Sequence, residues 1–167
     1  GASSLAVKGA AAGKADSLTL VLDNAADATD TTVATSLTIA DVETLHIVSE
    51  GATAAGGNAI AGLTVAAGST VTVDGASKLD LQLDAASTVA VVEVKGAGAH
   101  KVDFAAAATY ATGKSLTIDG SAATGKLTLD GTDFTGAVTA QTLTIIGGSG
   151  ADTITSAGGV WTKSIID

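Results

Sequence analysis

The 167-residue sequence contains no cysteine, proline, methionine or arginine, and it has only four aromatic residues. Without cysteine the chain forms no disulfide bond and no thiolate metal site. The missing arginine and the few aromatic rings exclude nucleic acid as a partner, because neither a basic patch nor a base-stacking set is present. No apolar run approaches the length of about 18 residues that a membrane span needs.

Small residues dominate what is present: 35 alanines, 25 threonines and 21 glycines make up nearly half of the chain. Disordered chains are poor in β-branched residues and rich in charge. Here 46% of the residues are hydrophobic and only 15% are charged, which favours an ordered chain. We expect a narrow β-structure whose interior holds Val, Ile, Leu and Ala and leaves no room for stacked large rings.

The formal net charge is −9, and 14 of the 17 acidic residues are aspartates. Aspartate belongs in turns, where its short side chain bonds to nearby backbone, and it is a common oxygen ligand for Ca²⁺. An acidic, cysteine-free chain also suits a protein that stays unfolded inside the cell and folds outside, where millimolar calcium neutralises the repelling carboxylates.

A tripeptide of apolar residue, threonine and apolar residue recurs along the chain, for example at Leu37–Ile39 and Leu63–Val65. Three copies run on into Asp-Gly, at Val71–Gly75, Leu116–Gly120 and Leu127–Gly131. Alternation of apolar and polar residues is typical of a β-strand with one buried face. Repetition of one short strand and one turn is typical of a stacked solenoid.

The strands that these patterns predict cover most of the chain, and no convincing amphipathic helix is present. They span residues 17–23, 37–39, 45–48, 63–65, 71–73, 79–83, 89–94, 116–119, 127–130, 138–146 and 160–166. The four strands from Leu63 onward start eight, eight and ten residues apart, as expected when the chain turns a corner after each strand.

The fold class we expect is all-β, a right-handed parallel β-helix or related β-solenoid with roughly twenty residues per coil. Hairpins produce similar spacings, so an antiparallel β-sandwich is the alternative. Because the chain begins at Gly1 and ends just after an apolar run, we interpret residues 1–167 as a single solenoid fragment of a larger secreted protein.

One segment carries a recognisable chemistry. Residues 147–155 fit the nonapeptide G-G-x-G-x-D-x-U-x, in which U is a large apolar residue. Glycines at Gly147, Gly148 and Gly150 let the backbone turn and direct carbonyl oxygens at one point, and Asp152 adds a carboxylate. Such hard oxygen ligands suit Ca²⁺. One nonapeptide supplies half of a site, and an upstream turn with Asp130 and Asp133 is a candidate for the other half.

The nonapeptide resembles that of RTX proteins, the calcium-folded proteins exported by type I secretion. The rest of the chain is similar to the bacterial surface-layer (S-layer) branch of that group, in its composition, its missing cysteine and its segment Asp41–Val48 (DVETLHIV). The resemblance implies that Gly147, Gly148, Gly150 and Asp152 ligate calcium. A full RTX block has many consecutive nonapeptides, and this chain has one.

Other aspartates are weaker candidates for calcium. Asp74, Asp119 and Asp130 each end a predicted strand and precede a glycine. Either they begin turns or they are further calcium ligands.

Catalytic patterns are not supported. His46 lies mid-strand opposite Leu45 and Ile47, which indicates a solvated strand residue. His100 has Asp103 nearby but no nucleophile elbow or third partner. The carboxylate pairs Asp80/Asp84 and Asp130/Asp133 lack the aromatic platforms of carbohydrate-active β-helices. We therefore expect no enzyme.

The resulting prediction is a structural S-layer segment that self-associates into a calcium-dependent two-dimensional lattice on the bacterial cell surface. Its partners are other copies of itself and, through other parts of the full protein, cell-surface polysaccharide. Two alternatives stay open: a stalk or binding module of a secreted RTX adhesin, and a calcium-folded accessory domain of a secreted enzyme.

Overall fold

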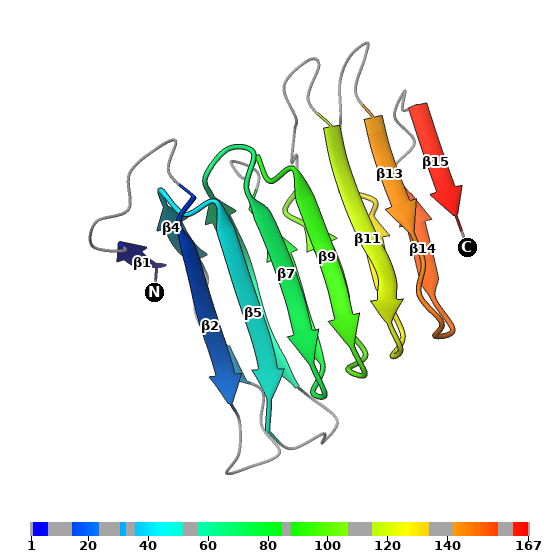
Figure 1. The fold of residues 1–167 in the computed structure, drawn as a ribbon, viewed down its shortest axis with the longest axis horizontal. Helices are drawn as coiled ribbons and strands as arrows, with labels where there is room; N and C mark the ends of the chain where they lie inside the picture. The colour runs from blue at the N-terminus through cyan, green and yellow to red at the C-terminus, as the bar shows by residue number, and fades with distance from the viewer. Residues whose placement is uncertain are drawn as a thin grey trace.

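The computed structural model describes residues 2–6, 15–23, 31–32, 36–51, 57–84, 88–106, 115–133, 142–156 and 162–166. These residues form two β-sheets and no helix (Figure 1). Sheet A has eight strands: β1 (Ala2–Ala6), β3 (Thr31–Thr32), β4 (Ser36–Ala40), β6 (Asn58–Val65), β8 (Leu79–Leu83), β10 (Lys101–Phe104), β12 (Thr128–Gly131) and β14 (Thr153–Ser156). Sheet B has seven: β2 (Ser17–Asp23), β5 (Thr44–Glu50), β7 (Thr70–Gly75), β9 (Val91–Gly96), β11 (Ser115–Ala123), β13 (Thr142–Ile146) and β15 (Thr162–Ile166).

The chain alternates between the two sheets, so each sheet gains strands in sequence order along the long axis of the molecule (Figure 1). All pairings within the described residues are parallel, for example β5 with β7 and β7 with β9. Strands of sheet B run opposite to those of sheet A, as expected for a chain that turns a corner after each strand. The predicted parallel β-solenoid is confirmed, and the antiparallel sandwich is wrong. The right-handedness of the solenoid stays a prediction.

The strand register shows how many residues each coil contains. Leu45 pairs with Val71 and Val71 pairs with Val92, so successive coils place equivalent residues 26 and 21 positions apart. The expected twenty residues per coil is therefore the lower end of the observed range. The variation lies in the connections, because loops at corners change length without disturbing the strand ladder.

The core is built from ladders of apolar side chains, one from each coil. In every apolar–Thr–apolar tripeptide the apolar residues face inward and the threonine faces outward, because successive side chains of a strand point to opposite faces. One ladder of sheet B consists of Leu18, Leu45, Val71, Val92, Ile118 and Ile145. From Leu45 to Ile145 these side chains are fully buried. The alternation in the sequence thus predicted the core correctly.

One aromatic residue does enter the interior. Phe104 is 1% exposed and belongs to a ladder with Leu37, Leu63 and Leu83 in sheet A. The next position along this ladder is Gly131, one residue beyond the pair Asp103–Asp130. A glycine beside the ring leaves it room. The interior therefore accommodates one large ring. The expectation that it has no room for stacked rings stays a prediction, because the other three aromatic residues lie outside the described residues.

Several strands escaped the sequence patterns. β10 was missed because its outward positions carry Lys101 and Asp103 instead of threonine. Residues 58–62 of β6 and the two-residue β3 also lie outside the predicted strands. Residues 138–141 of one predicted strand and Trp161 of another lie outside the described residues.

The short connections from sheet B to sheet A stack directly on one another. A Cβ atom at Gly125 would overlap the carbonyl oxygens of Ala97 and Gly98 in the preceding turn, and one at Gly150 would overlap Gly125. Backbone hydrogen bonds join the same turns, such as Gly98 N–H to Gly75 O at 3.0 Å and Ser149 N–H to Ala123 O at 3.0 Å. Glycine recurs at this corner because the backbones of neighbouring coils touch there.

Candidate functional site

The glycine-rich nonapeptide forms the corner between β13 and β14. Ile154 packs partly buried against the core at the start of the next strand, as predicted. A Cβ atom at Gly148 would lie 2.5 Å from Ala123 O and 2.7 Å from Gly120 O. The glycines of the motif therefore have a packing role against the turn below, apart from any role toward a metal.

Both oxygens of Asp152 are engaged by backbone. The N–H of Leu127, one coil earlier, donates to Oδ1 at 2.8 Å, and the N–H of Gly148 donates to Oδ2 at 2.7 Å. Hydrogen bonds to an ionised carboxylate are about twice as strong as those between neutral groups. Asp152 thus closes its own turn and ties it to the preceding coil.

The upstream partner proposed for this motif lies elsewhere. Leu127 pairs with the position of Asp152, whereas Asp130 pairs with Thr155, three residues further along the strand and roughly 10 Å away. Asp130 Oδ1 accepts hydrogen bonds from Thr132 Oγ1 at 2.7 Å and from Thr132 N–H at 3.2 Å, which hold the pKa of Asp130 below its ordinary value. The structure does not bring Asp130 or the exposed Asp133 to the nonapeptide.

Asp74 is the next-to-last residue of β7, whereas Asp119 lies inside β11, where the pairing with β9 shifts register. Asp74 Oδ1 accepts the N–H of Gly75 at 2.7 Å, and Asp119 Oδ1 accepts the N–H of Ser121 at 2.9 Å. Lys95 lies between these coils. Its ion pair with Glu93, at 2.7 Å, raises the pKa of Lys95, and Asp74 and Asp119 act in the same direction. Each of these aspartates caps a turn through its own backbone.

The carboxylates among the predicted calcium ligands do not cluster in the described part of the chain. Within the described ranges, no three His, Asp or Glu side chains gather in a way that could hold an ion. Among the eight candidates (Gly147, Gly148, Gly150, Asp152, Asp130, Asp133, Asp119 and Asp74), Asp152 has both oxygens on backbone N–H groups and no second carboxylate opposite. The assignment of calcium to these residues stays a prediction.

Replacing Asp152 with alanine tests its structural role. We expect a loss of about 2–3 kcal/mol in the free energy of unfolding, because two backbone N–H groups lose a charged acceptor. The Asp152→Asn protein, which keeps one acceptor oxygen, should lose less. Urea unfolding without calcium, monitored by circular dichroism, measures both losses. Equal stability of all three proteins in the absence of calcium would contradict the structural role and favour ligation.

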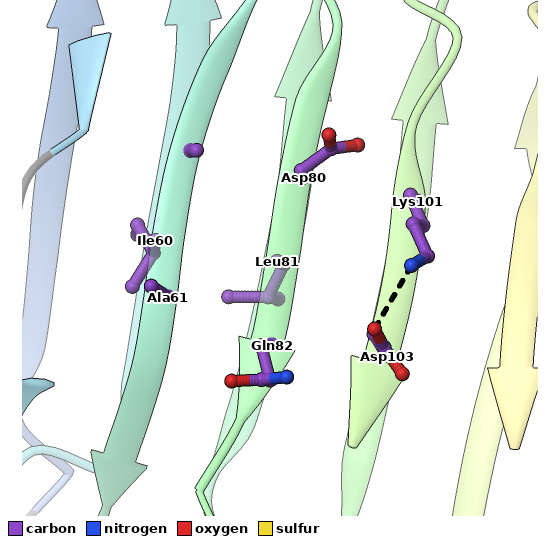
Figure 2. A pocket seen from close by; sticks show the side chains of 8 residues that line it. Ile60, Ala61, Asp80, Leu81, Gln82, Lys101 and Asp103 are labelled. Carbon is purple, nitrogen blue, oxygen red and sulfur yellow. Dashed lines mark hydrogen bonds and ion pairs between the residues drawn. The ribbon is translucent and has the colours of Figure 1, made fainter. Parts of the chain in front are cut away.

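A shallow depression of about 180 Å³ lies on the outer face of sheet A (Figure 2). The pairing of β6 with β8 shifts register between Ile60 and Leu63, and only Ala59 and Ala61 face outward beside the longer side chains of β8 and β10. The eight residues that line it are Ala59, Ile60, Ala61, Asp80, Leu81, Gln82, Lys101 and Asp103.

The polar groups around the depression come from β8 and β10. Lys101 Nζ pairs with Asp103 Oδ2 at 2.9 Å, which raises the pKa of Lys101 (Figure 2). Asp80 Oδ2 pairs with Lys78 at 2.8 Å, while its Oδ1 is buried and has no hydrogen-bond partner among the described residues. Together with the Gln82 amide, these groups present both donors and acceptors to a small polar ligand.

Sequence reasoning did not find this depression. It considered Asp80 only as a glycosidase carboxylate, and it did not recognise β10. The signal that could have found it is the pattern Lys-x-Asp at Lys78–Asp80 and Lys101–Asp103, which recurs one coil apart.

The comparisons with known proteins give no family. No protein-family model matches the chain, and no curated protein or solved structure is significantly similar to it. Within the described ranges there is also no helix with the length and hydrophobicity to cross a membrane. The β-solenoid fold and the geometry above are therefore the basis for any proposal about function.

Proposed function

We propose that this chain is a structural segment of a secreted bacterial surface-layer protein, and that copies of it self-associate into a two-dimensional lattice. The observation that carries the proposal is the stacking of parallel strands in both sheets, which spreads the chain into two broad, regular outer faces. A solenoid of this kind suits repeated contacts between copies better than it suits the shaping of a deep cleft.

The outer face of sheet B supports this proposal. Register places Thr44, Thr70, Val91, Thr117 and Thr144 in one column, one residue per coil. Neighbouring strands lie about 4.8 Å apart, so this column repeats a short, β-branched side chain at a constant spacing. Short side chains lose little conformational entropy on contact, which favours packing against a second ordered surface.

Calcium enters the proposal as the expected cofactor only. The net charge of −9 means that copies repel one another, and this repulsion is weaker when cations are present. Because the described donors do not close a site, no step of assembly is assigned to a bound ion.

Assembly is tested directly with the purified chain. We expect sheets with a regular repeat, visible by negative-stain electron microscopy, when millimolar calcium is added, and their dissolution by a chelator. Magnesium at the same ionic strength is the control for simple screening. A chain that stays monomeric by light scattering at every calcium concentration contradicts lattice formation. Sheets that ignore the chelator contradict the calcium requirement but not self-assembly.

A second candidate function is a binding module of an adhesin, and the depression at Asp80 favours it. A buried acceptor without a partner, next to an amide and an ammonium group, fits the hydroxyl groups of a saccharide. The same preparation distinguishes the two functions. An adhesin module stays monomeric and shows chemical-shift changes at Asp80 and Gln82 when neutral saccharides are added, whereas a lattice segment assembles without them.

A further inference from the structure

His100 is a buried histidine at the corner that leads into β10. Its side chain is 1% exposed. Register places it in a column with one residue from each neighbouring coil: Asn58, Leu79, His100, Leu127 and Asp152. Polar and apolar residues alternate along this column. The His100 backbone belongs to the same ladder, since Thr128 N–H donates to His100 O at 2.9 Å.

The imidazole joins two coils through one hydrogen bond. The N–H of Leu79 donates to His100 Nδ1 at 3.2 Å. Nδ1 must therefore be unprotonated, and a neutral ring carries its proton on Nε2. Nε2 is buried and has no hydrogen-bond partner among the described residues. The equivalent bond two coils later is that of Leu127 N–H to Asp152 Oδ1, so a side-chain acceptor recurs at this corner.

Protonation of this ring would break the hydrogen bond between Leu79 N–H and Nδ1. A proton on Nδ1 would point at the N–H of Leu79, which is also a donor. The ring packs closely against Gly98, where an added Cβ atom would lie 2.7 Å from Cε1 and 2.8 Å from Nε2. The positive charge would also be largely removed from water, which is costly.

Burial and the surrounding polar groups act on His100 in opposite directions. Burial lowers the pKa of His100, while the carbonyls of Gly75 and Lys95 and the carboxylate of Asp74 act in the opposite direction. Lys78 and Lys126, which precede Leu79 and Leu127 in the sequence, are the nearest cationic residues along the neighbouring strands. The dominant effect is burial, so the native ring is neutral.

We propose that His100 is a pH-sensitive lock, which holds the coils of β8 and β10 together when neutral and releases this corner when protonated. The device lies in the stacked turns of sheet A and acts on the cohesion of the solenoid. It goes beyond the function proposed above and does not depend on it.

The sign of the effect follows from the linkage between protonation and folding. Above the ordinary histidine pKa of 6.5 both folded and unfolded chains hold a neutral His100, so the residue adds no pH dependence. As the pH falls below that value, the unfolded chain takes up a proton that the folded chain resists. The equilibrium constant for unfolding should then rise by up to about tenfold per pH unit, until the folded form is protonated as well.

The two histidines of the chain provide a matched experiment. His46 on β5 has a side chain that is 39% exposed, with Nε2 3.7 Å from Asp74 Oδ2. His100→Asn keeps an acceptor near Leu79 but removes the titrating ring, and Asn58 occupies the same column. Urea unfolding of the wild-type, His100→Asn and His46→Asn proteins is measured at pH 7.5 and 5.5.

Between these two pH values the unfolding constant of the wild type should rise by up to about tenfold more than that of His100→Asn. His46→Asn should follow the wild type. The same pH response in His100→Asn and the wild type would overturn the proposal, as would transfer of the pH response to His46.

A second measurement on the wild type keeps the proposal testable if His100→Asn does not fold. Long-range ¹H–¹⁵N spectra of the imidazoles should show His100 as the Nε2–H tautomer at pH 7.5, and its ring should resist protonation below the ordinary histidine pKa of 6.5. The Leu79 amide should exchange slowly at pH 7.5 and faster at pH 5.5, relative to amides elsewhere in β8. A ring protonated on Nδ1, or one that titrates at or above its ordinary value, would overturn the proposal.

Discussion

The Gly75→Ala protein is expected to lose about 2–5 kcal/mol of unfolding free energy, or to fail to fold. Gly75 ends β7 with φ of +121° and lies against the turn of the preceding coil. A Cβ atom there would overlap the carbonyl of Ser49 and lie 2.9 Å from its nitrogen. The contact is backbone on backbone, so neither partner can move without breaking the ladder in which Ser77 N–H donates to Ser49 O.

Gly68 is the matched control for this substitution. It also has a positive φ, +80°, but a Cβ atom at Gly68 would meet nothing within 4 Å. Gly68→Ala should therefore show only the conformational cost of about 1–2 kcal/mol. Urea unfolding of both variants, followed by circular dichroism, separates strain from overlap. Equal losses in the two proteins would contradict the stacking of the corners.

The Phe104→Ala protein should lose about 3–5 kcal/mol of unfolding free energy. Phe104 heads the fully buried side chains in size, and its ladder continues through Leu83 and Leu63. Removal of the ring leaves a cavity next to Gly131, which has no side chain to fill it. Because coils of a solenoid contact only their neighbours, we expect the damage to begin at β10 and β12.

Two control variants provide a comparison for the stability loss of Phe104→Ala. Phe104→Leu continues the leucine ladder and should lose less than Phe104→Ala. Val21→Ala removes methyl groups from a side chain that is 52% exposed and should change stability by no more than about 0.5 kcal/mol. Hydrogen exchange of the β10 and β12 amides should rise first in Phe104→Ala. Uniform exchange along all strands would contradict a local effect.

Much of the fold was readable from the sequence, because alternation is a local property of each strand. Leu18, Leu20 and Leu22 in β2 and Leu45 and Ile47 in β5 point inward as predicted. His46 points outward with the threonines, and so do Val21 and Val48. Asp-Gly after a strand correctly marked the corner at Gly75, but at Asp119–Gly120 the strand continues to Ala123 across a register shift. β10 was not readable, since KVDF presents charged residues where the other strands present threonine.

The candidate site was less predictable. The motif at residues 147–155 was located correctly as a corner before a strand, and the interpretation of its aspartate as half of a calcium site stays a prediction. The backbone N–H groups that engage Asp152 belong to Gly148 and to Leu127, which is 25 residues away in the sequence. Nor does the sequence show that Asp130 lies along the strand from Asp152 instead of opposite it, because this depends on register.

Residue types and their alternation settle which positions of this chain face inward, since a strand presents its side chains to opposite faces whatever surrounds it. They also settle that the chain turns where glycine and aspartate cluster. The partner of each corner is decided by the lengths of the loops, which set how many residues separate one coil from the next. These separations bring Leu79 to His100, Leu127 to Asp152 and Ser49 to Gly75. Only the folded structure shows these contacts, because they join residues that are far apart in the sequence.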